Sequence, residues 1–415
     1  MNTIETVAVI GLGYIGLPTA AVLAGNGIHV IGVDVNSGTV ESVNRGEVPF
    51  VEPDLASYVA GAVSQKKLSA STETPSVQAY IVAVPTPFNP DHTADVSYIK
   101  AAAQGIAPQL VGGELIILES TSPPGTTQLL GDYLISLRPD LSLDGADDKP
   151  AIHVAHCPER VLPGRIMIEL VTNDRIVGGL TPKAAELARA LYAVFCQGEI
   201  LVTDAATAEM AKLVENSYRD VNIAFANELS IISDKLGINV WELIKLANHH
   251  PRVNILQPGP GVGGHCIAVD PWFIVAAAPE ESQLIRQARE TNDSKPDWVV
   301  KKVVDAVGDI VSPKIAVLGL AFKANIDDLR ESPAVAIVER LSSKMDGADL
   351  LVVEPHVDRL PRQLSGLANV SLQELESAVA AADAVLLLVD HDDFKAMDRN
   401  LVAGKPVVDT RGLWE

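Results

Sequence analysis

Short apolar runs alternate with amphipathic stretches over the first half of the chain. The runs are rich in Val, Ile, Leu and Ala, and the stretches between them, such as Tyr98–Leu110, carry the periodicity of a helix. Strands that alternate with helices form a parallel sheet with helices on both faces. We therefore predict a doubly wound sheet whose strands include Val7–Ile10, His29–Val33, Ala79–Val84, Leu115–Leu118 and Ala151–Ala155.

The pattern changes to helix without strands between about residue 203 and residue 300. Thr203 or Asp204 can accept hydrogen bonds from the first N–H groups of a helix, and Gly237 can end that helix. The stretch between them is long for a globular protein. We expect it to form a spine helix that joins two lobes.

The alternation of strand and helix returns near residue 314. There KIAVLGLAF resembles VAVIGLGYI near the N-terminus, LLVVEPH resembles VIGVDVN, and AVLLLVDH resembles AYIVAVPTP. The predicted fold class is α/β, with two Rossmann-like doubly wound domains joined by a helical middle domain. We place the three domains at residues 1–202, 203–305 and 306–415. Because the second half has only Gly319 where the first half has a full glycine pattern, we expect its ligand to bind differently.

Composition and charge narrow the classes of partner. The chain has 415 residues, of which 47% are hydrophobic and 20% charged, and its formal net charge is −21. This acidity disfavours binding to nucleic acid or to an anionic membrane surface. Three cysteines are too few for a disulfide framework, and MNTIETVAVIG lacks the basic region of a signal peptide. We expect a soluble, cytoplasmic protein without nucleic-acid or membrane partners.

A glycine pattern near the N-terminus predicts a dinucleotide site. Gly11, Gly13 and Gly16 form G-x-G-x-x-G directly after a predicted strand and at the start of a helix. The first glycine permits a tight turn, the second lets a diphosphate approach the backbone, and the third lets helix and strand pack closely. Asp34 ends the next strand, where a carboxylate accepts ribose hydroxyls and repels a 2′-phosphate, which favours NAD over NADP. The alternative is a structural glycine turn followed by a solvated Asp.

Two threonines follow later strands of the same predicted sheet. Thr86 lies in Val84-Pro85-Thr86-Pro87 and Thr121 in Glu119-Ser120-Thr121. Doubly wound sheets bind ligands at the carboxyl ends of their strands. Both threonines are therefore candidate cofactor contacts.

The segment HHPRVNILQPGPGVGGHCIAVDPW is the strongest candidate for a catalytic loop. So many Gly and Pro residues inside a helical region are costly unless the loop lines a site. Cys266 follows Gly263 and Gly264, and a thiolate is a strong nucleophile where cations or N–H groups lower its pKa. The alternative is a small buried cysteine. Asp270, which precedes Pro271, is either a catalytic carboxylate or the N-cap of a helix.

Further polar residues stand in three segments, each with an ordinary structural alternative. Lys212, Asn216 and Arg219 share one face of the long predicted helix, either as a solvated stripe or, where buried, as groups suited to stabilising an oxyanion. CPERVLPGR follows a strand and supplies three charged residues, unless it is an ordinary surface turn; these residues are Glu159, Arg160 and Arg165. FKANIDDLRESP offers Lys323 and Arg330 to a phosphate or carboxylate, although its own Asp327 and Asp328 can pair with those bases.

Together these segments resemble the UDP-glucose/GDP-mannose dehydrogenase family. The resemblance rests on GLGYIGLP, VPTPF, ESTSPPGTT, CPERVLPGR, AEMAKLVENSYRDVNIAFANEL, HPRVNILQPGPGVGGHCIAVDPWF and FKANIDDLRESP, which span nearly the whole chain in the family's order. It implies an N-terminal NAD domain, a helical dimerising middle and a C-terminal domain that helps to bind a UDP-sugar. The branch it resembles most oxidises UDP-N-acetyl-D-mannosamine twice at C6, to the uronate used in bacterial surface polysaccharides. His265 stands where other branches often have an aromatic residue, so the sugar preference of the UDP-glucose enzymes is not carried over.

The resemblance also implies a role for each matching position. Cys266 would capture the aldehyde as a thiohemiacetal that is then oxidised to a thioester. The other catalytic positions would be Asp270 and Thr121 for proton removal, Lys212 and Asn216 for the oxyanions, and Glu159 for hydrolysis. The sugar nucleotide would be held by Arg160, Val161, Lys212, Asn216, Arg219, His250, Arg252, Gly263 and Lys323. NAD would be held by Gly11, Gly13, Tyr14, Ile15, Gly16, Asp34, Thr86, Thr121 and Arg330, and no metal is expected.

Three alternatives for the function remain open. The same chemistry could act on UDP-N-acetylglucosamine, UDP-glucose or GDP-mannose, because these sugars differ by the placement or kind of one substituent. A single-step dehydrogenase of the hydroxyacid type would leave GGHCIAVDP and the third domain without a role. A non-catalytic NAD-binding regulator would require Cys266 to be inert.

Overall fold

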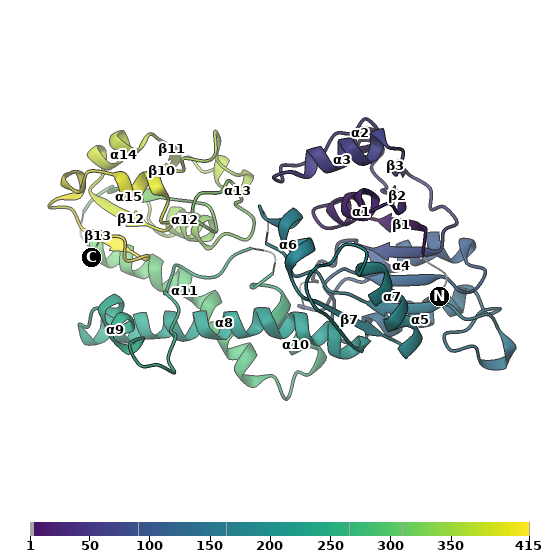
Figure 1. Cartoon of the computed structure of the whole chain (residues 1–415). Helices are drawn as coiled ribbons and strands as arrows, with labels where there is room; N and C mark the ends of the chain where they lie inside the picture. Colours follow the sequence, from purple (N-terminus) through teal and green to yellow (C-terminus); the bar gives the residue numbers. More distant parts are fainter. Residues whose placement is uncertain (1–3, 90, 163, 265, 309, 415) are drawn as a thin grey trace. The chain divides into compact units, whose positions relative to one another are not determined.

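The computed structural model describes residues 4–89, 91–162, 164–264, 266–308 and 310–414. The chain folds into two compact units, residues 1–215 and 216–415 (Figure 1). The predicted three-domain boundaries, at 203 and 306, remain a prediction. No helix in these described ranges is both long and apolar enough to cross a membrane.

The first unit is built on one large sheet. Its strands are β1 (Thr6–Ile10), β2 (His29–Val33), β3 (Leu68–Ser71), β4 (Ala79–Val82), β5 (Leu115–Leu118), β6 (His153–His156), β7 (Arg175–Gly179) and β8 (Ile200–Asp204). They lie in the order β3-β2-β1-β4-β5-β6-β7-β8, and every neighbouring pair is parallel except β6 and β7. From β1 the strand order runs first towards β3 and then, from β4 onwards, in the opposite direction across the sheet. Such folds bind nucleotides in the crevice at the carboxyl ends of the two strands where the order switches, here β1 and β4.

Helices cover both faces of this sheet. They are α1 (Gly16–Gly25), α2 (Ser37–Asn44), α3 (Leu55–Ser64), α4 (Ser97–Ile106), α5 (Thr126–Leu137), α6 (Ile166–Thr172) and α7 (Pro182–Tyr192), with short 3₁₀ turns η1 (Ala107–Gln109) and η2 (Ala146–Asp148). Several predicted bounds were wrong by one to four residues. The strand predicted at Ala151–Ala155 is His153–His156, the strand predicted to reach Val84 ends at Val82, and the helix predicted to reach Leu110 ends at Ile106.

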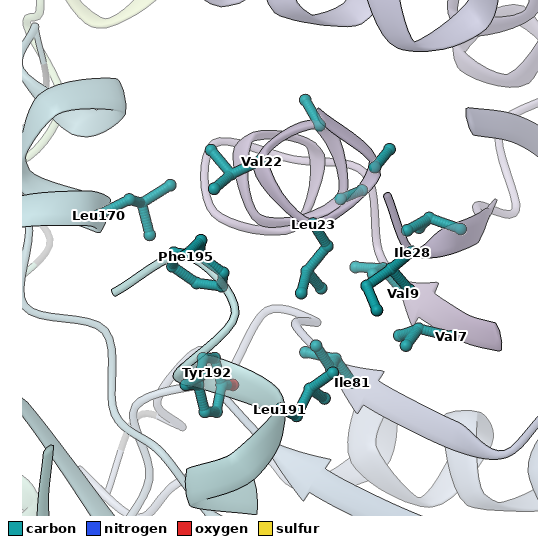
Figure 2. Packing of buried hydrophobic residues seen from close by; sticks show 14 of the residues in the cluster. Val7, Val9, Val22, Leu23, Ile28, Ile81, Leu170, Leu191, Tyr192 and Phe195 are labelled. Carbon is teal, nitrogen blue, oxygen red and sulfur yellow. The ribbon is translucent and has the colours of Figure 1, made fainter. Parts of the chain in front are cut away.

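Two hydrophobic cores lie on opposite faces of the sheet because side chains alternate along each strand. Val7 and Val9 of β1 belong to the core under α1 and α7, whereas Ala8 and Ile10 belong to the core under α4 and α5. Figure 2 shows the first core, with Leu23 of α1 directed towards Val9 and Ile81. This packing fixes where α1 begins and therefore where the glycine turn lies.

The described residues in the middle of the chain form helices without strands, as predicted. They are α8 (Ala205–Leu236), α9 (Val240–Ala247), α10 (Asp270–Ala277) and α11 (Gln283–Val307). Asp204 Oδ1 accepts a hydrogen bond from Thr207 N at 2.9 Å, so Asp204 caps α8 as predicted. Gly237, with φ of 69°, ends α8 while Ile238 N donates to Ser233 O at 2.9 Å, which is a Schellman motif.

The C-terminal part repeats the strand order of the first sheet. Its strands are β9 (Lys314–Leu318), β10 (Asp349–Val353), β11 (Val370–Leu372), β12 (Ala384–Leu387) and β13 (Val407–Asp409), in the order β11-β10-β9-β12-β13 and all parallel. This matches β3-β2-β1-β4-β5, so the prediction of two Rossmann-like domains around a helical middle is confirmed. The accompanying helices are α12 (Pro333–Lys344), α13 (Arg362–Ser365), α14 (Leu375–Ala381), α15 (Asp392–Ala396) and the 3₁₀ turn η3 (Arg399–Val402).

Candidate active site

The glycine turn has the geometry that a dinucleotide site requires. Gly11 has φ of 96°, and a Cβ there would lie 2.5 Å from Ala83 O. A Cβ on Gly16 would collide with Gly11 O, so only glycine lets α1 start this close to β1. A Cβ on Gly13 would meet no heavy atom of the described residues within 4 Å, which leaves its backbone open to a ligand. These residues fit a diphosphate at the start of α1.

Asp34 lies at the end of β2 and braces the same turn. Its Oδ2 accepts a hydrogen bond from Leu12 N at 2.9 Å, and its Oδ1 accepts one from Asn36 N at 2.9 Å. Each carboxylate oxygen can accept a second hydrogen bond, so the group can still bind ribose hydroxyls. The Tyr14 ring packs against the Phe50 ring, with 4.3 Å between the two ring centroids, so Phe50 also supports the glycine turn.

The loops after β4 and β5 are tied to each other. Thr86 Oγ1 donates to Thr121 O at 2.5 Å, and Ser120 Oγ donates to Val84 O at 2.6 Å. The structure therefore brings the two candidate threonines together at the carboxyl ends of neighbouring strands. Sequence spacing predicted that both threonines lie at the carboxyl edge of the sheet, but it did not predict the hydrogen bonds that join their two loops.

The CPERVLPGR loop is held by carboxylates on several sides. Glu52 is 7% exposed, and its two oxygens accept hydrogen bonds from Gly164 N at 2.9 Å and Ile166 N at 2.8 Å. The Arg160 guanidinium pairs with Glu215 at 2.6 Å. Arg165 pairs with Glu169 at 3.2 Å, so part of the loop's charge is used locally. Pro163 lies outside the described residues.

Glu159 belongs to a buried group of charges beneath that loop. Its Oε1 accepts a hydrogen bond from Arg160 N at 2.6 Å, and its Oε2 is 3.9 Å from Arg175, which is also 3.9 Å from Glu119. Burial, reinforced by the charge of Glu159, raises the pKa of Glu119 to about 7. The Glu119 carboxyl group can therefore hold and release a proton near neutral pH.

The start of α8 is anchored to the loop that carries Thr121. Glu209 is 1% exposed, and its carboxylate accepts hydrogen bonds from Gly125 N and Thr127 N, both at 2.6 Å. It thereby satisfies free N–H groups at the start of α5. Lys212 lies about one turn further along α8 and is half-buried, whereas Arg219 is exposed. Along the predicted polar stripe, Lys212 is therefore half-buried, Asn216 is buried and Arg219 is exposed.

Hydrogen bonds link Asp270 to both Asn216 and Cys266 in the second unit. Asn216 Nδ2 donates to Asp270 Oδ2 at 2.6 Å, and both residues are buried. Asp270 N donates to Cys266 O at 2.9 Å, so the carboxylate follows the cysteine by one turn. The N-cap of α10 is Val269 and Asp270 is the first residue of that helix, so Asp270 does not occupy the N-cap position that the capping alternative gave it.

The three cysteines differ in environment. Cys157 is buried, Cys196 is intermediate and Cys266 is exposed. Burial raises the pKa of Cys157 to about 12, which makes that thiol a poor nucleophile. Because Cys266 is exposed, the alternative of a small buried cysteine at that position was wrong. His265 lies outside the described residues.

The glycines before Cys266 accommodate the protein itself. A Cβ on Gly263 would lie 2.5 Å from Glu331 O and 3.0 Å from the Phe322 Cβ, and one on Gly264 would lie 3.3 Å from the Phe322 ring. The loop that carries Cys266 thus packs against the FKANIDDLRESP segment. Packing against Phe322 is a reason for these two glycines that sequence spacing could not reveal.

The FKANIDDLRESP segment is fixed by polar residues at its base. Arg330 pairs with Asp328 at 2.6 Å, as the structural alternative allowed, and Lys323 is exposed. Glu354 directly follows β10 as Asp34 directly follows β2, but the Glu354 carboxylate is buried and accepts hydrogen bonds from Leu320 N and Ala321 N. The second Rossmann-like domain therefore uses its acid for internal support, and the expected difference in ligand binding stays a prediction.

The remaining candidates lie outside these clusters. His250 and Arg252 are exposed, and Arg252 N lies 3.3 Å from His250 Nδ1. In the part of the chain that the structure describes, no cluster of His, Cys, Asp and Glu could hold a metal ion.

Comparisons with known proteins cover the whole chain. Residues 5–196 match the NAD binding domain of the UDP-glucose/GDP-mannose dehydrogenase family, residues 206–294 its central domain and residues 316–415 its UDP binding domain. An NDP-N-acetyl-D-galactosaminuronic acid dehydrogenase from Ralstonia nicotianae is 57% identical over 99% of this chain and 96% of its own length. A UDP-N-acetyl-D-mannosamine dehydrogenase from Salmonella typhi is 55% identical over 99% of both chains. The solved structure of a UDP-D-ManNAc dehydrogenase from Pyrococcus horikoshii is 38% identical, with a TM-score of 0.86 over 99% of this chain and 96% of that one.

Proposed function

The chain belongs to the UDP-glucose/GDP-mannose dehydrogenase family, and on that premise we propose that it oxidises UDP-N-acetyl-D-mannosamine to UDP-N-acetyl-D-mannosaminuronate. It is an NAD-dependent UDP-sugar dehydrogenase. The observation that carries the choice of sugar is the 55% identity, over nearly all of both chains, with a relative named for that substrate. The reaction consumes one water and two NAD⁺ and yields the carboxylate, two NADH and three protons.

The first oxidation removes a hydride and a proton from the C6 alcohol. The turn of Gly11, Gly13 and Gly16 would hold NAD, which would supply the hydride acceptor for each oxidation. Asp270, aided by a water near Thr121, takes the hydroxyl proton. The hydrogen bond from Asn216 at 2.6 Å supports this role because it fixes the orientation of the Asp270 carboxylate.

Cys266 retains the aldehyde and makes the second oxidation possible. Its thiolate adds to the C6 carbonyl to form a thiohemiacetal, whose oxidation gives a thioester that water hydrolyses. The exposure of Cys266 on a loop of glycines supports this assignment. Lys212 and Asn216 stabilise the negative oxygen of each tetrahedral species, and Glu159 assists the hydrolytic water.

Binding roles follow the same matching positions. Arg160, Val161, Arg219, His250, Arg252, Gly263 and Lys323 hold the sugar nucleotide. Tyr14, Ile15, Asp34, Thr86, Thr121 and Arg330 contribute to the NAD site. The Arg330 guanidinium is exposed although its partner Asp328 is partly buried, and this exposure supports a role for Arg330 in binding a phosphate.

A second sugar has a specific observation in its favour. The relative with 57% identity is named for an N-acetyl-D-galactosaminuronic acid nucleotide. The two sugars place the same kinds of substituent differently, so the same residues can perform the chemistry on either. UDP-N-acetyl-D-galactosamine is therefore the second candidate substrate.

The enzyme acts as a cytoplasmic homodimer in this proposal. Tyr218, Phe225 and Ile232 recur every seven residues on α8, and each is at least 45% exposed. An apolar stripe with this period suits helix-to-helix packing between two copies of the chain.

The test is the rate of NADH formation with each of four substrates. UDP-N-acetyl-D-mannosamine should give the highest kcat/KM, with UDP-N-acetyl-D-galactosamine, UDP-N-acetylglucosamine and UDP-glucose as comparisons. The product should have the mass of the uronate. A preference for the galactosamine nucleotide would select the second candidate, and no oxidation of any of them would contradict the proposal.

A further inference from the structure

A chain of buried hydrogen bonds runs beneath the loop that carries Cys266. Its members are Asp220 and Asn227 of α8 and Arg289 and Asn292 of α11, and each is at most 1% exposed. Arg289 NH1 donates to Asp220 Oδ1, and Asn292 Nδ2 donates to the same carboxylate at 2.8 Å. Asn227 Nδ2 donates to Asn292 Oδ1 at 2.8 Å, which completes the chain.

Both ends of this chain reach the catalytic loop. At one end Gly259 N donates to Asn227 Oδ1 at 2.9 Å. At the other end Arg289 NH1 lies 3.5 Å from Ile267 O, immediately after Cys266. The segment between these points contains Gly259, Gly261, Gly263 and Gly264. Glycine backbone is the least restrained of all, so such a loop needs fixed points outside itself.

Stability alone does not explain these polar residues. Burial raises the pKa of Asp220 to about 6, although Arg289 opposes the rise, so the carboxylate is costly to keep charged. Buried ion pairs of this kind can often be replaced by apolar side chains without loss of stability. What apolar side chains could not supply is a directional partner for Gly259 N and for Ile267 O.

We propose that Asn227 and Arg289 are positioning residues that hold the Cys266 loop at its two ends, with Asp220 and Asn292 fixing their orientation. They touch neither substrate nor cofactor in this account. Their role in turnover rests on the proposed function, whereas the restraint on the loop does not.

The test compares Asn227→Ala with Asn369→Ala. Asn369 is a matched control, because it also makes side-chain hydrogen bonds, to Ser342 and Ala348, but in the C-terminal sheet domain. Amide hydrogen exchange of peptides covering residues 256–270 should accelerate at least about tenfold in Asn227→Ala and stay unchanged in Asn369→Ala. The kcat of Asn227→Ala should fall at least about tenfold, while the KM for NAD stays within about twofold.

Each outcome decides the proposal. Unchanged exchange in the loop would overturn the restraint, and faster exchange with normal kcat would overturn the positioning role. If the wild-type protein oxidised no sugar nucleotide, the proposed function would fail while the exchange result still tested the restraint. Should Asn227→Ala not fold, Asn227→Ser removes the same reach and keeps a polar atom in the buried site.

Discussion

Lys295 on α11 is a buried cation whose charge should make stability depend on pH. Its side chain is almost fully buried, its ammonium donates to Ser230 Oγ, and it lies 3.9 Å from the centroid of the Trp298 ring. Burial lowers the pKa of Lys295 from 10.5 to about 7, and the charge of Asp234 opposes this only in part.

The sign of the effect follows from proton binding. A lysine whose pKa is lower in the folded state binds fewer protons there than in the unfolded chain, so stability rises with pH between the two values. The window here runs from about 7 to 10.5. Within it the free energy of unfolding gains up to about 1.4 kcal/mol per pH unit, which amounts to about 2 kcal/mol between about pH 7 and pH 9.

Lys295→Met isolates this contribution because it removes the charge and keeps the length of the side chain. Urea unfolding of the variant and of the wild type should be compared at pH 7 and pH 9. The free energy of unfolding of the variant relative to wild type should fall by about 2 kcal/mol from the lower to the higher pH. Lys301→Met, on the same helix but with an exposed lysine paired to Asp305, should show no such change. An equal difference at both pH values would contradict a lowered pKa of Lys295 in the folded protein.

Three further substitutions test separate parts of the molecule. Gly16→Ala places a Cβ against Gly11 O and should raise the Kd for NAD at least about tenfold in calorimetry; an unchanged Kd would show that the turn does not bind NAD. Glu209→Gln presents an amide N–H₂ to one of the two N–H groups that its carboxylate now accepts and should lower the free energy of unfolding by about 1–3 kcal/mol, measured by urea unfolding; no loss would mean that the cap is dispensable. Cys266→Ser should slow the second oxidation by at least about a hundredfold in single-turnover NADH traces, and full uronate production would contradict covalent catalysis.

The sequence predicted features that depend on local spacing. Gly11 and Gly16 have the close contacts expected of a glycine turn, and short segments of the second Rossmann-like domain resemble those of the first. Both features could be predicted because each depends on a few consecutive residues. The long helix was predicted with its cap at Asp204 and its end at Gly237, since capping residues act within one turn.

Features that depend on residues far apart in sequence could not be predicted. Glu209 caps a helix 82 residues away, and Glu52 braces a loop 112 residues away. One signal was available on α8, where Asp220 and Asn227 stand seven residues apart and therefore share a helix face. Polar residues on a buried face require partners, but the sequence does not say that one partner is Gly259 of the catalytic loop.

The central claim is a double oxidation through a thioester on Cys266. The most direct test is the amount of NADH formed from a limiting amount of UDP-N-acetyl-D-mannosamine with NAD in excess. Two NADH should form for each sugar, with complete conversion to the uronate. One NADH for each sugar, with release of the aldehyde, would contradict the double oxidation.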